Sequence, residues 1–236
     1  MTKNIVVTGA SRGIGKAILE KYASEGWNIA FNSLNEDSVR KTTLELSQKY
    51  PTIKMYSQVC DMSIQRDVTD FANQAIASLG KIDILVNNAG RYTPGTISES
   101  NYDDQLEELM KVNLYSAYWI GKIIIPHMVS HQSGHIFTIS SIAGLQAYPN
   151  GGSYAITKFA LQGYIRTLRE ELKTKHICVT GVYPGATYTD SWSMSELPVE
   201  RFVKPEDIAT QIYAISQLSP QTVVEDIVIR PQLGDI

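Results

Sequence analysis

The sequence predicts an α/β fold built on a doubly wound parallel sheet, and three observations lead to that expectation. Short runs rich in Val and Ile recur along the 236 residues, longer segments with the period of an amphipathic helix separate them, and a glycine-rich turn follows the first run. Because strands that alternate with helices form parallel sheets covered on both faces, we expect one layer of strands between two layers of helices.

Seven stretches have the length and composition of strands. They cover residues 4–8, 28–32, 53–59, 83–86, 134–140, 177–183 and 223–230, and six helices are expected in the intervals. Right-handed crossovers leave few topologies for such a chain, and ligands of open parallel sheets bind outside the carboxyl ends of the strands, where the strand order reverses. We therefore expect the functional residues to follow the carboxyl ends of these strands.

Length and composition indicate one domain that acts on a small molecule. With 43% hydrophobic residues, residues 1–236 are enough for a single core and short for two full domains. The 21 basic and 24 acidic residues form no block of like charge, which argues against nucleic-acid and membrane partners. No apolar run approaches the roughly 18 residues of a membrane span, and no signal-peptide pattern opens the sequence. Two cysteines without metal-ligand spacing fit a cytoplasmic location.

One segment fits no regular element. Residues 184–205 carry Trp192, Met194 and Leu197 among polar side chains. A long irregular segment in a compact domain is often a lid over an active site, so this segment is a candidate substrate lid.

The turn TGASRGIG, residues 8–15, follows the first predicted strand and precedes a helical segment. Glycines allow the backbone to turn tightly and to approach a pyrophosphate, whose charge is met by the N–H groups and the positive end of the next helix. The spacing Gly-x-x-x-Gly-x-Gly differs from the general Gly-x-Gly-x-x-Gly fingerprint, but strand, turn and helix occur in the required order. This pattern predicts a Rossmann-type dinucleotide site.

The end of the second strand distinguishes NAD from NADP. An acidic side chain there would bind the ribose 2′-OH of NAD, whereas a 2′-phosphate needs that acid absent and a cation nearby. The sequence has Ser33 at this place, and Arg12 in the glycine turn can reach toward a phosphate. This favours NADP(H), although the lack of a second cation near Asn35 leaves NAD(H) open. Asp61, after the third strand, is placed to accept from the adenine amino group or to be a solvated acid without that role.

Three Tyr–Lys pairs have the i, i+4 spacing that places both side chains on one helix face. Pro51 interrupts Tyr50/Lys54, and Tyr118/Lys122 has no hydroxyl partner shortly before it. Only Tyr154/Lys158 follows a strand that ends in Ser140–Ser141 and a turn rich in Gly, Pro and Asn. This pair is therefore predicted to lie at the carboxyl edge of the sheet, beside the glycine turn.

The chemistry of this group fits carbonyl reduction. A phenol needs its pKa lowered by about 3 units to exchange protons well near pH 7, and we expect the Lys158 ammonium and an oxidised nicotinamide to lower it. Tyr154 would then donate a proton to a carbonyl oxygen as hydride arrives, and Ser141 would orient that oxygen. Tyr148 and Trp192 are predicted to line the substrate pocket with them, since aromatic walls suit small ligands.

In these motifs the chain resembles the short-chain dehydrogenase/reductase family, in its single-domain branch, over essentially its whole length. The matching pieces are TGASRGIG, the strand-end Asp61, NNAG at residues 87–90, Asn113 in KVNLYS, Ser141 thirteen residues before Tyr154, YAITK to Lys158, and YPGATYT at residues 183–189.

The resemblance implies a role for each matching residue. It implies that Asn113 supports a water relay to Lys158, that Lys158 also binds the nicotinamide ribose, and that Thr187 and Thr189 lie near the carboxamide. It also implies a homodimer or homotetramer built on the long helices around Asn113 and Lys158. The expected cofactor contacts are Gly9, Ser11, Arg12, Gly13, Ile14, Gly15, Ser33, Asp61, Met62, Asn87, Ala89, Gly90, Tyr154, Lys158, Pro184, Gly185, Thr187 and Thr189.

Two departures from the family pattern leave the substrate open. Lys204 follows Thr189 by only fifteen residues, and the ending VVEDIVIRPQLGDI lacks the glycine pair of many members. The ending and the short lid are similar to those of sepiapterin-type reductases and 3-hydroxy acid dehydrogenases, and TGASRGIG is similar to 3-oxoacyl-acyl-carrier-protein reductases. Alternative functions are a cofactor-sensing binding protein and a nucleotide-sugar epimerase.

A metal site is not expected. His127, His131 and His135 are spaced four apart, but Gly134 is predicted to end the helix before His135, which would open a strand.

Overall fold

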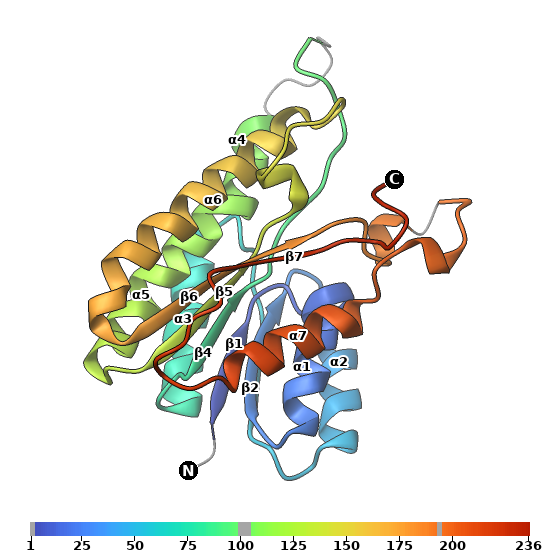
Figure 1. Cartoon of the computed structure of the whole chain (residues 1–236). Helices are drawn as coiled ribbons and strands as arrows, with labels where there is room; N and C mark the ends of the chain where they lie inside the picture. Colours follow the sequence, from blue (N-terminus) through green and yellow to red (C-terminus); the bar gives the residue numbers. More distant parts are fainter. Residues whose placement is uncertain (1–2, 99–104, 193–194) are drawn as a thin grey trace.

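The computed structural model describes residues 3–98, 105–192 and 195–236 (Figure 1). Seven parallel strands form one sheet in the order β3-β2-β1-β4-β5-β6-β7, so the strand order reverses between β1 and β4. The strands are β1 (Asn4–Val7), β2 (Asn28–Ser33), β3 (Met55–Val59), β4 (Ile84–Asn87), β5 (Gly134–Ile139), β6 (Ile177–Pro184) and β7 (Asp226–Ile229). The predicted fold class is confirmed.

Helices connect successive strands and cover both faces of the sheet (Figure 1). The longer ones are α1 (Gly13–Ser24), α2 (Glu36–Lys49), α3 (Gln65–Leu79), α4 (Gln105–Met110), α5 (Ser116–Ser130), α6 (Gly152–Leu172) and α7 (Pro205–Ser216). A π-helical turn, Lys111–Tyr115, joins α4 to α5. One apolar core lies between the sheet and α3, α5 and α6, and a second lies on the other face under α1 and α7.

Two predicted strands, β3 and β7, begin two or three residues later than expected, and β4 begins one residue later. Ile53 still belongs to the turn after α2, where its N–H donates to Tyr50 O, so β3 begins at Met55. Before β7, the carbonyl of Val224 accepts from the Thr180 hydroxyl at 2.6 Å, so a side chain takes the place of a regular ladder bond. Side-chain hydrogen bonding of this kind is not visible in a hydropathy pattern.

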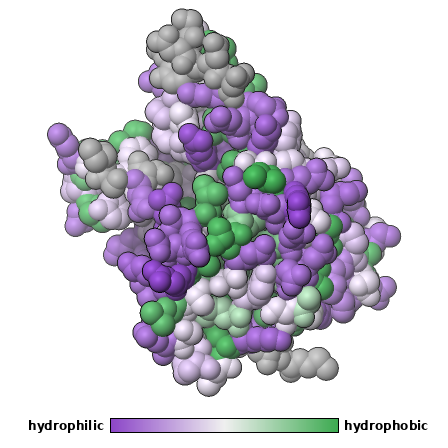
Figure 2. Space-filling view, turned by 180° about the vertical axis from the view of Figure 1, so that it is seen from behind, coloured by the Kyte–Doolittle hydropathy of each residue, from purple (hydrophilic) through white to green (hydrophobic). Residues whose placement is uncertain are grey.

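The outer surface is mixed in character. Figure 2 shows hydrophilic side chains over most of one face, with smaller apolar patches in a band near its middle. None of the helices in the described ranges is long and apolar enough to cross a bilayer.

The segment predicted as a lid, residues 184–205, is held by contacts near both of its ends and is called the strap below. Thr187 and Val203 form a parallel bridge, and the amide of Tyr188 donates to Val203 O at 2.9 Å. Phe202 packs against Tyr188 and Trp192, with ring centroids 5.7 and 5.2 Å away. Two short 3-10 turns, Asp190–Trp192 and Val199–Arg201, lie within the strap, and Met194 lies outside the described residues.

Candidate active site

The residues predicted from sequence gather along the carboxyl edge of the sheet. The glycine turn follows β1, Ser33 ends β2, Asp61 and Met62 follow β3, Asn87 ends β4, Ser141 follows β5, and Pro184 ends β6. Tyr154 and Lys158 lie on the first two turns of α6, which reaches over this edge (Figure 1).

The glycine turn leaves the start of α1 open for an anion. Gly9 and Gly13 have φ of +62° and +54°, which a residue with a Cβ rarely adopts. The first turn of α1 contains no acidic residue, and no side chain caps its N–H groups. By contrast, α2 is capped by Asn35 and begins with two acids. Because exposed N–H groups at a helix start attract anions, α1 fits the pyrophosphate of a dinucleotide.

The loop after β4 holds this turn in place. Thr8 Oγ1 accepts from the amides of Asn88 and Ala89, each at 3.0 Å, and Asn88 Nδ2 donates to the carbonyls of Thr8 and Gly9 at 2.9 Å. A Cβ on Gly15 would lie 2.5 Å from Asn88 Nδ2, so this glycine is required for the approach. Thr8 and Asn88 were missed as individual positions, although both lie within the quoted motifs.

The Ser11 and Ser33 hydroxyls meet at 2.7 Å between the turn and the end of β2. Arg12 is exposed and forms an ion pair with Asp190 of the strap at 2.9 Å. The place where an acid would bind a ribose therefore has two neutral hydroxyls, with a cation next to one of them. Two neutral hydroxyls can accommodate a negatively charged 2′-phosphate, whereas a carboxylate at position 33 would repel it.

Past β3, the two predicted cofactor contacts differ in character. Asp61 Oδ1 accepts from the amide and hydroxyl of Ser63 at 2.8 and 2.7 Å, so one of its oxygens is used in a local turn. The Met62 side chain is buried in the core beside Cys60, which leaves the backbone of Met62 as the part able to face a ligand.

Tyr154, Ser141 and Lys158 come together as predicted. The Ser141 hydroxyl lies near the Tyr154 phenol, where it acts to lower the phenol pKa, and it accepts from the Ala143 amide at 3.1 Å. Lys158 is buried, its Nζ donates to Ile139 O at 3.2 Å, and it lies 5.7 Å from the centre of the Tyr154 ring. A phenol, a hydroxyl and a buried ammonium therefore share one end of β5.

The expected lowering of the phenol pKa does not come from the protein. Burial raises the pKa of Tyr154 to about 12, and the hydrogen bond from Ser141 only partly opposes this. Burial also lowers the pKa of the Lys158 ammonium to about 8. Desolvation is the largest effect on both groups and is not visible in sequence spacing, and a lowering of the Tyr154 pKa by Lys158 and an oxidised nicotinamide stays a prediction.

Asn113 lies in the π-helical turn and is buried. Its Oδ1 accepts from the Arg91 amide at 2.7 Å, and its Nδ2 donates to Arg91 O at 3.0 Å and to Thr157 Oγ1 at 2.9 Å. Its amide thus joins the loop after β4 to α6. A Cβ placed on Gly90 would lie 3.4 Å from Asn113 Oδ1 and 3.6 Å from Lys158 Nζ, so both groups border the same glycine.

A cavity of about 590 Å³ opens beside the phenol, and it contains the predicted substrate residues Ser141, Tyr148, Tyr154 and Trp192. The predicted cofactor residues Ile14, Pro184, Gly185, Thr187 and Thr189 line it as well. The size suits a small molecule together with part of a cofactor.

Sequence reasoning missed several further lining residues, among them Tyr92, Leu145, Arg230 and Asp235. The segment after β7 folds back so that Asp235 pairs with Arg230 and reaches Gly185, where a Cβ would lie 2.3 Å from Asp235 Oδ1. No spacing rule connects these positions to Tyr154. Tyr92 lies two residues after the NNAG motif, and this position could have identified it as a residue of the site.

The three histidines separate as expected. His135 lies in β5, stacked on Phe137 with ring centroids 4.0 Å apart, while His127 and His131 are at the end of α5. Within the described ranges, no three His, Cys, Asp or Glu side chains are grouped to hold a metal ion.

Comparisons with known proteins agree with this geometry. Residues 3–197 match the model of the family described as short chain dehydrogenase. The sepiapterin reductase of Chlorobaculum tepidum is 30% identical over 241 residues, which cover 98% of this chain and 97% of the relative.

Solved structures give the same picture. An alcohol dehydrogenase from the archaeon Thermococcus sibiricus, complexed with 5-hydroxy-NADP, superposes with a TM-score of 0.89 and 27% identity over 98% of this chain and 97% of that chain. A 7α-hydroxysteroid dehydrogenase complexed with NADH and 7-oxo glycochenodeoxycholic acid has a TM-score of 0.86 and 28% identity over 99% and 94%. Similar proteins therefore bind both kinds of nicotinamide dinucleotide.

Proposed function

Because the chain belongs to the short-chain dehydrogenase family, and is thus an oxidoreductase that uses a nicotinamide cofactor, we propose that it reduces the carbonyl of a small substrate to an alcohol with NADPH, reversibly. The observation that carries this proposal is that Tyr154 and Ser141 line the 590 Å³ cavity and that the buried Lys158 Nζ lies 5.7 Å from the centre of the Tyr154 ring. The cofactor supplies the hydride when bound.

The side chains take complementary parts in this reaction. Tyr154 donates the proton that the reduced carbonyl oxygen takes up, and Ser141 holds that oxygen by a hydrogen bond. Lys158 places a positive charge beside the phenol and is positioned to bind the nicotinamide ribose. Asn113 fixes the spacing between the loop that carries Gly90 and α6. The pKa of about 12 keeps the Tyr154 phenol protonated near pH 7 but makes it a weak acid, so we expect the positive charge of the oxidised nicotinamide to lower this pKa and assist proton exchange.

The preference for NADPH is supported by the neutral hydroxyls of Ser11 and Ser33 and by the nearby Arg12. Use of NADH stays part of the test, since Arg12 is the single cation identified at this place. The two cysteines are free thiols, which supports a location in the reducing cytoplasm. Exposed Tyr118, Ile156 and Phe159 on α5 and α6 support a homodimer or homotetramer, to be measured by light scattering.

The decisive experiment replaces Tyr154 with Phe, which removes the proton-donating oxygen and keeps the ring. With aldehydes and ketones screened against NADPH and NADH by absorbance, we expect turnover to fall by at least about 100-fold while cofactor affinity stays within about twofold. Tyr213→Phe on α7 is the matched control. Unchanged turnover in Tyr154→Phe would refute the proton-donor role, and tight NADPH binding without any turnover in the wild type would favour a cofactor-sensing protein.

A further inference from the structure

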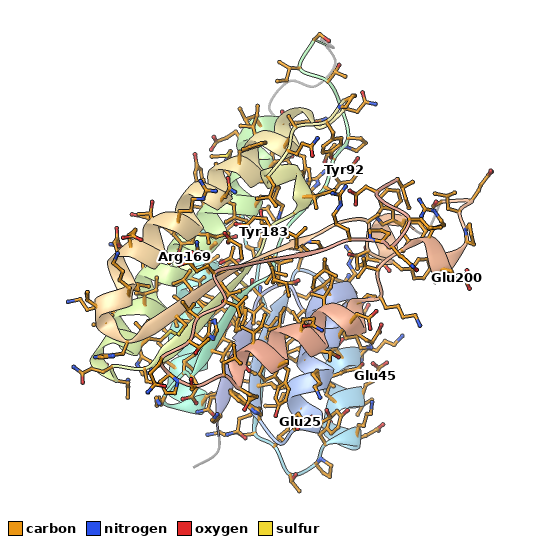
Figure 3. All side chains as sticks on the ribbon, viewed as in Figure 1. Glu25, Glu45, Tyr92, Arg169, Tyr183 and Glu200 are labelled. Carbon is orange, nitrogen blue, oxygen red and sulfur yellow. The ribbon has the colours of Figure 1, made fainter. Side chains whose placement is uncertain are left out.

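Tyr92 lies directly against the proton-donating tyrosine. Its ring is perpendicular to that of Tyr154, with centroids 5.0 Å apart and an interplanar angle of 89°. Tyr148 lies close enough for Tyr92 to raise its pKa, and all three tyrosines line the same cavity. Figure 3 labels Tyr92 at the carboxyl end of the sheet, between the start of α6 and the segment after β7. Three tyrosines therefore form one connected group.

The loop that carries Tyr92 is fixed on both sides of it. On one side, Asn113 binds both the N–H and the C=O of Arg91. On the other, the Gly95 amide donates to Asn150 O at 3.2 Å, and a Cβ on Gly152 would lie 2.4 Å from Gly95 O. Tyr92 is consequently held by the same buried amide that binds the helix of Tyr154.

We propose that Tyr92 is a positioning residue that fixes the orientation of the Tyr154 phenol toward the substrate carbonyl, and this rests on the proposed function. Rotation of a tyrosine about its Cα–Cβ bond, from one staggered rotamer to another, displaces the phenol oxygen unless neighbouring side chains restrict it. Tyr92 packs against the Tyr154 ring in the perpendicular arrangement that aromatic rings favour, so it restrains this rotation from the side. Proton transfer is sensitive to displacements of about 1 Å, so the rotamer of Tyr154 matters for the rate.

If Tyr92 contributed only to folding, its removal would change stability and not kcat. Tyr92 is 44% exposed, so its removal takes little from the core and is expected to change the unfolding midpoint only slightly. A positioning role instead lowers kcat with a smaller effect on KM. It also depends on the ring more than on the hydroxyl, because the ring makes the contact with Tyr154.

The test compares Tyr92→Leu, which removes the ring, with Tyr92→Phe, which retains it. For the best substrate of the wild type, we expect kcat of Tyr92→Leu to fall between about tenfold and 100-fold, with partial or full recovery in Tyr92→Phe. Tyr213→Leu is the matched control, because Tyr213 packs perpendicular to Tyr22 at 5.3 Å outside the cavity. Equal kcat in Tyr92→Leu and the wild type would overturn the proposal.

Crystal structures of the wild type and of Tyr92→Leu give a readout that needs no turnover. We expect the Tyr154 ring to rotate or to occupy two orientations in Tyr92→Leu and to keep one in the wild type. An unchanged ring in Tyr92→Leu would overturn the proposal even if kcat fell. If the wild type reduced no carbonyl at all, the proposed function would fail, and the structural comparison would still decide whether Tyr92 orients Tyr154.

Discussion

The hydroxyl oxygens of Ser11 and Ser33 lie 2.7 Å apart, which places the glycine turn and the end of β2 in direct contact. This contact occupies the place where the sequence of an NAD-binding protein would have an acid. Neutral hydroxyls can donate to a phosphate, and a carboxylate at the same place would repel it. The cofactor preference is therefore open to change by a single side chain.

Replacing Ser33 with Asp is expected to weaken NADPH binding by at least about tenfold and to leave NADH binding equal or tighter, because like charges at close range repel and a carboxylate can bind a 2′-OH. Dissociation constants measured by cofactor fluorescence check this. Ser47→Asp, at an exposed position near the end of α2, is a control that adds the same charge away from the predicted cofactor contacts. Equal weakening of both cofactors would mean that Ser33 does not face the 2′ position.

The ion pair between Arg12 and Asp190 leads to a second prediction. Both side chains are largely exposed, so the pair itself contributes little to stability, but it engages the cation needed for a 2′-phosphate. Arg12→Ala should weaken NADPH more than NADH. Asp190→Asn should strengthen NADPH binding severalfold and have little effect on NADH. Titration of both cofactors at low and high salt measures this, and a loss of NADPH affinity in Asp190→Asn would contradict it.

The buried Lys158 predicts the pH dependence of reduction. Its pKa is lowered to about 8, so the ammonium is charged below that pH and loses its proton above it. With NADPH saturating, kcat/KM for reduction should be flat from pH 6 to about 7.5 and decline above 8. Arg stays charged throughout this range, so Lys158→Arg should show a lower but pH-independent rate. A wild-type profile without a decline up to pH 9.5 would contradict this role.

His135 predicts a loss of stability in acid. Thr180 donates its hydroxyl hydrogen to Val224 O, so the His135 Nε2–H must donate to Thr180 Oγ1, at 2.8 Å. Burial lowers the pKa of His135 to about 4 from its ordinary 6.5, so the unfolded chain binds the extra proton first. The stabilisation is complete above pH 6.5 and is lost as the pH falls toward 4, amounting to roughly 3 kcal/mol.

Urea unfolding at pH 7 and pH 4.5 measures this loss. His135→Phe should remove that part of the pH dependence, while His131→Phe, at an exposed position, should not. A slope that persists unchanged in His135→Phe would assign the acid sensitivity to other groups.

The order of the elements was predictable from the sequence because each strand is a short apolar run and each crossover has a helical period. The site positions followed for a related reason, since the carboxyl ends of parallel strands meet at one edge and bring Ser33, Asn87 and Ser141 to it. Contacts between distant loops were not predictable. Tyr92 reaches Tyr154 only because Asn113 fixes the Arg91 peptide, and Asp235 reaches Gly185 only because the chain folds back after β7.

The burial of each side chain was the other property that could not be predicted from the sequence. The i, i+4 spacing placed Lys158 near Tyr154 but gave no sign that Lys158 is buried and Tyr154 partly buried. Burial raises the pKa of the Tyr154 phenol, whereas the spacing led us to expect a lowered pKa. The spacing therefore identified the residues of the site but not the protonation state of the phenol.

The bonds between Thr8, Asn88 and Gly9 join the phosphate turn to the neighbouring loop through groups of the protein alone. A turn held by such bonds loses little conformational freedom when a ligand binds. Association with the dinucleotide should therefore be a single fast phase in stopped-flow fluorescence, limited by diffusion and orientation. Replacing Asn88 with Ala would loosen the turn and add a slower phase of rearrangement.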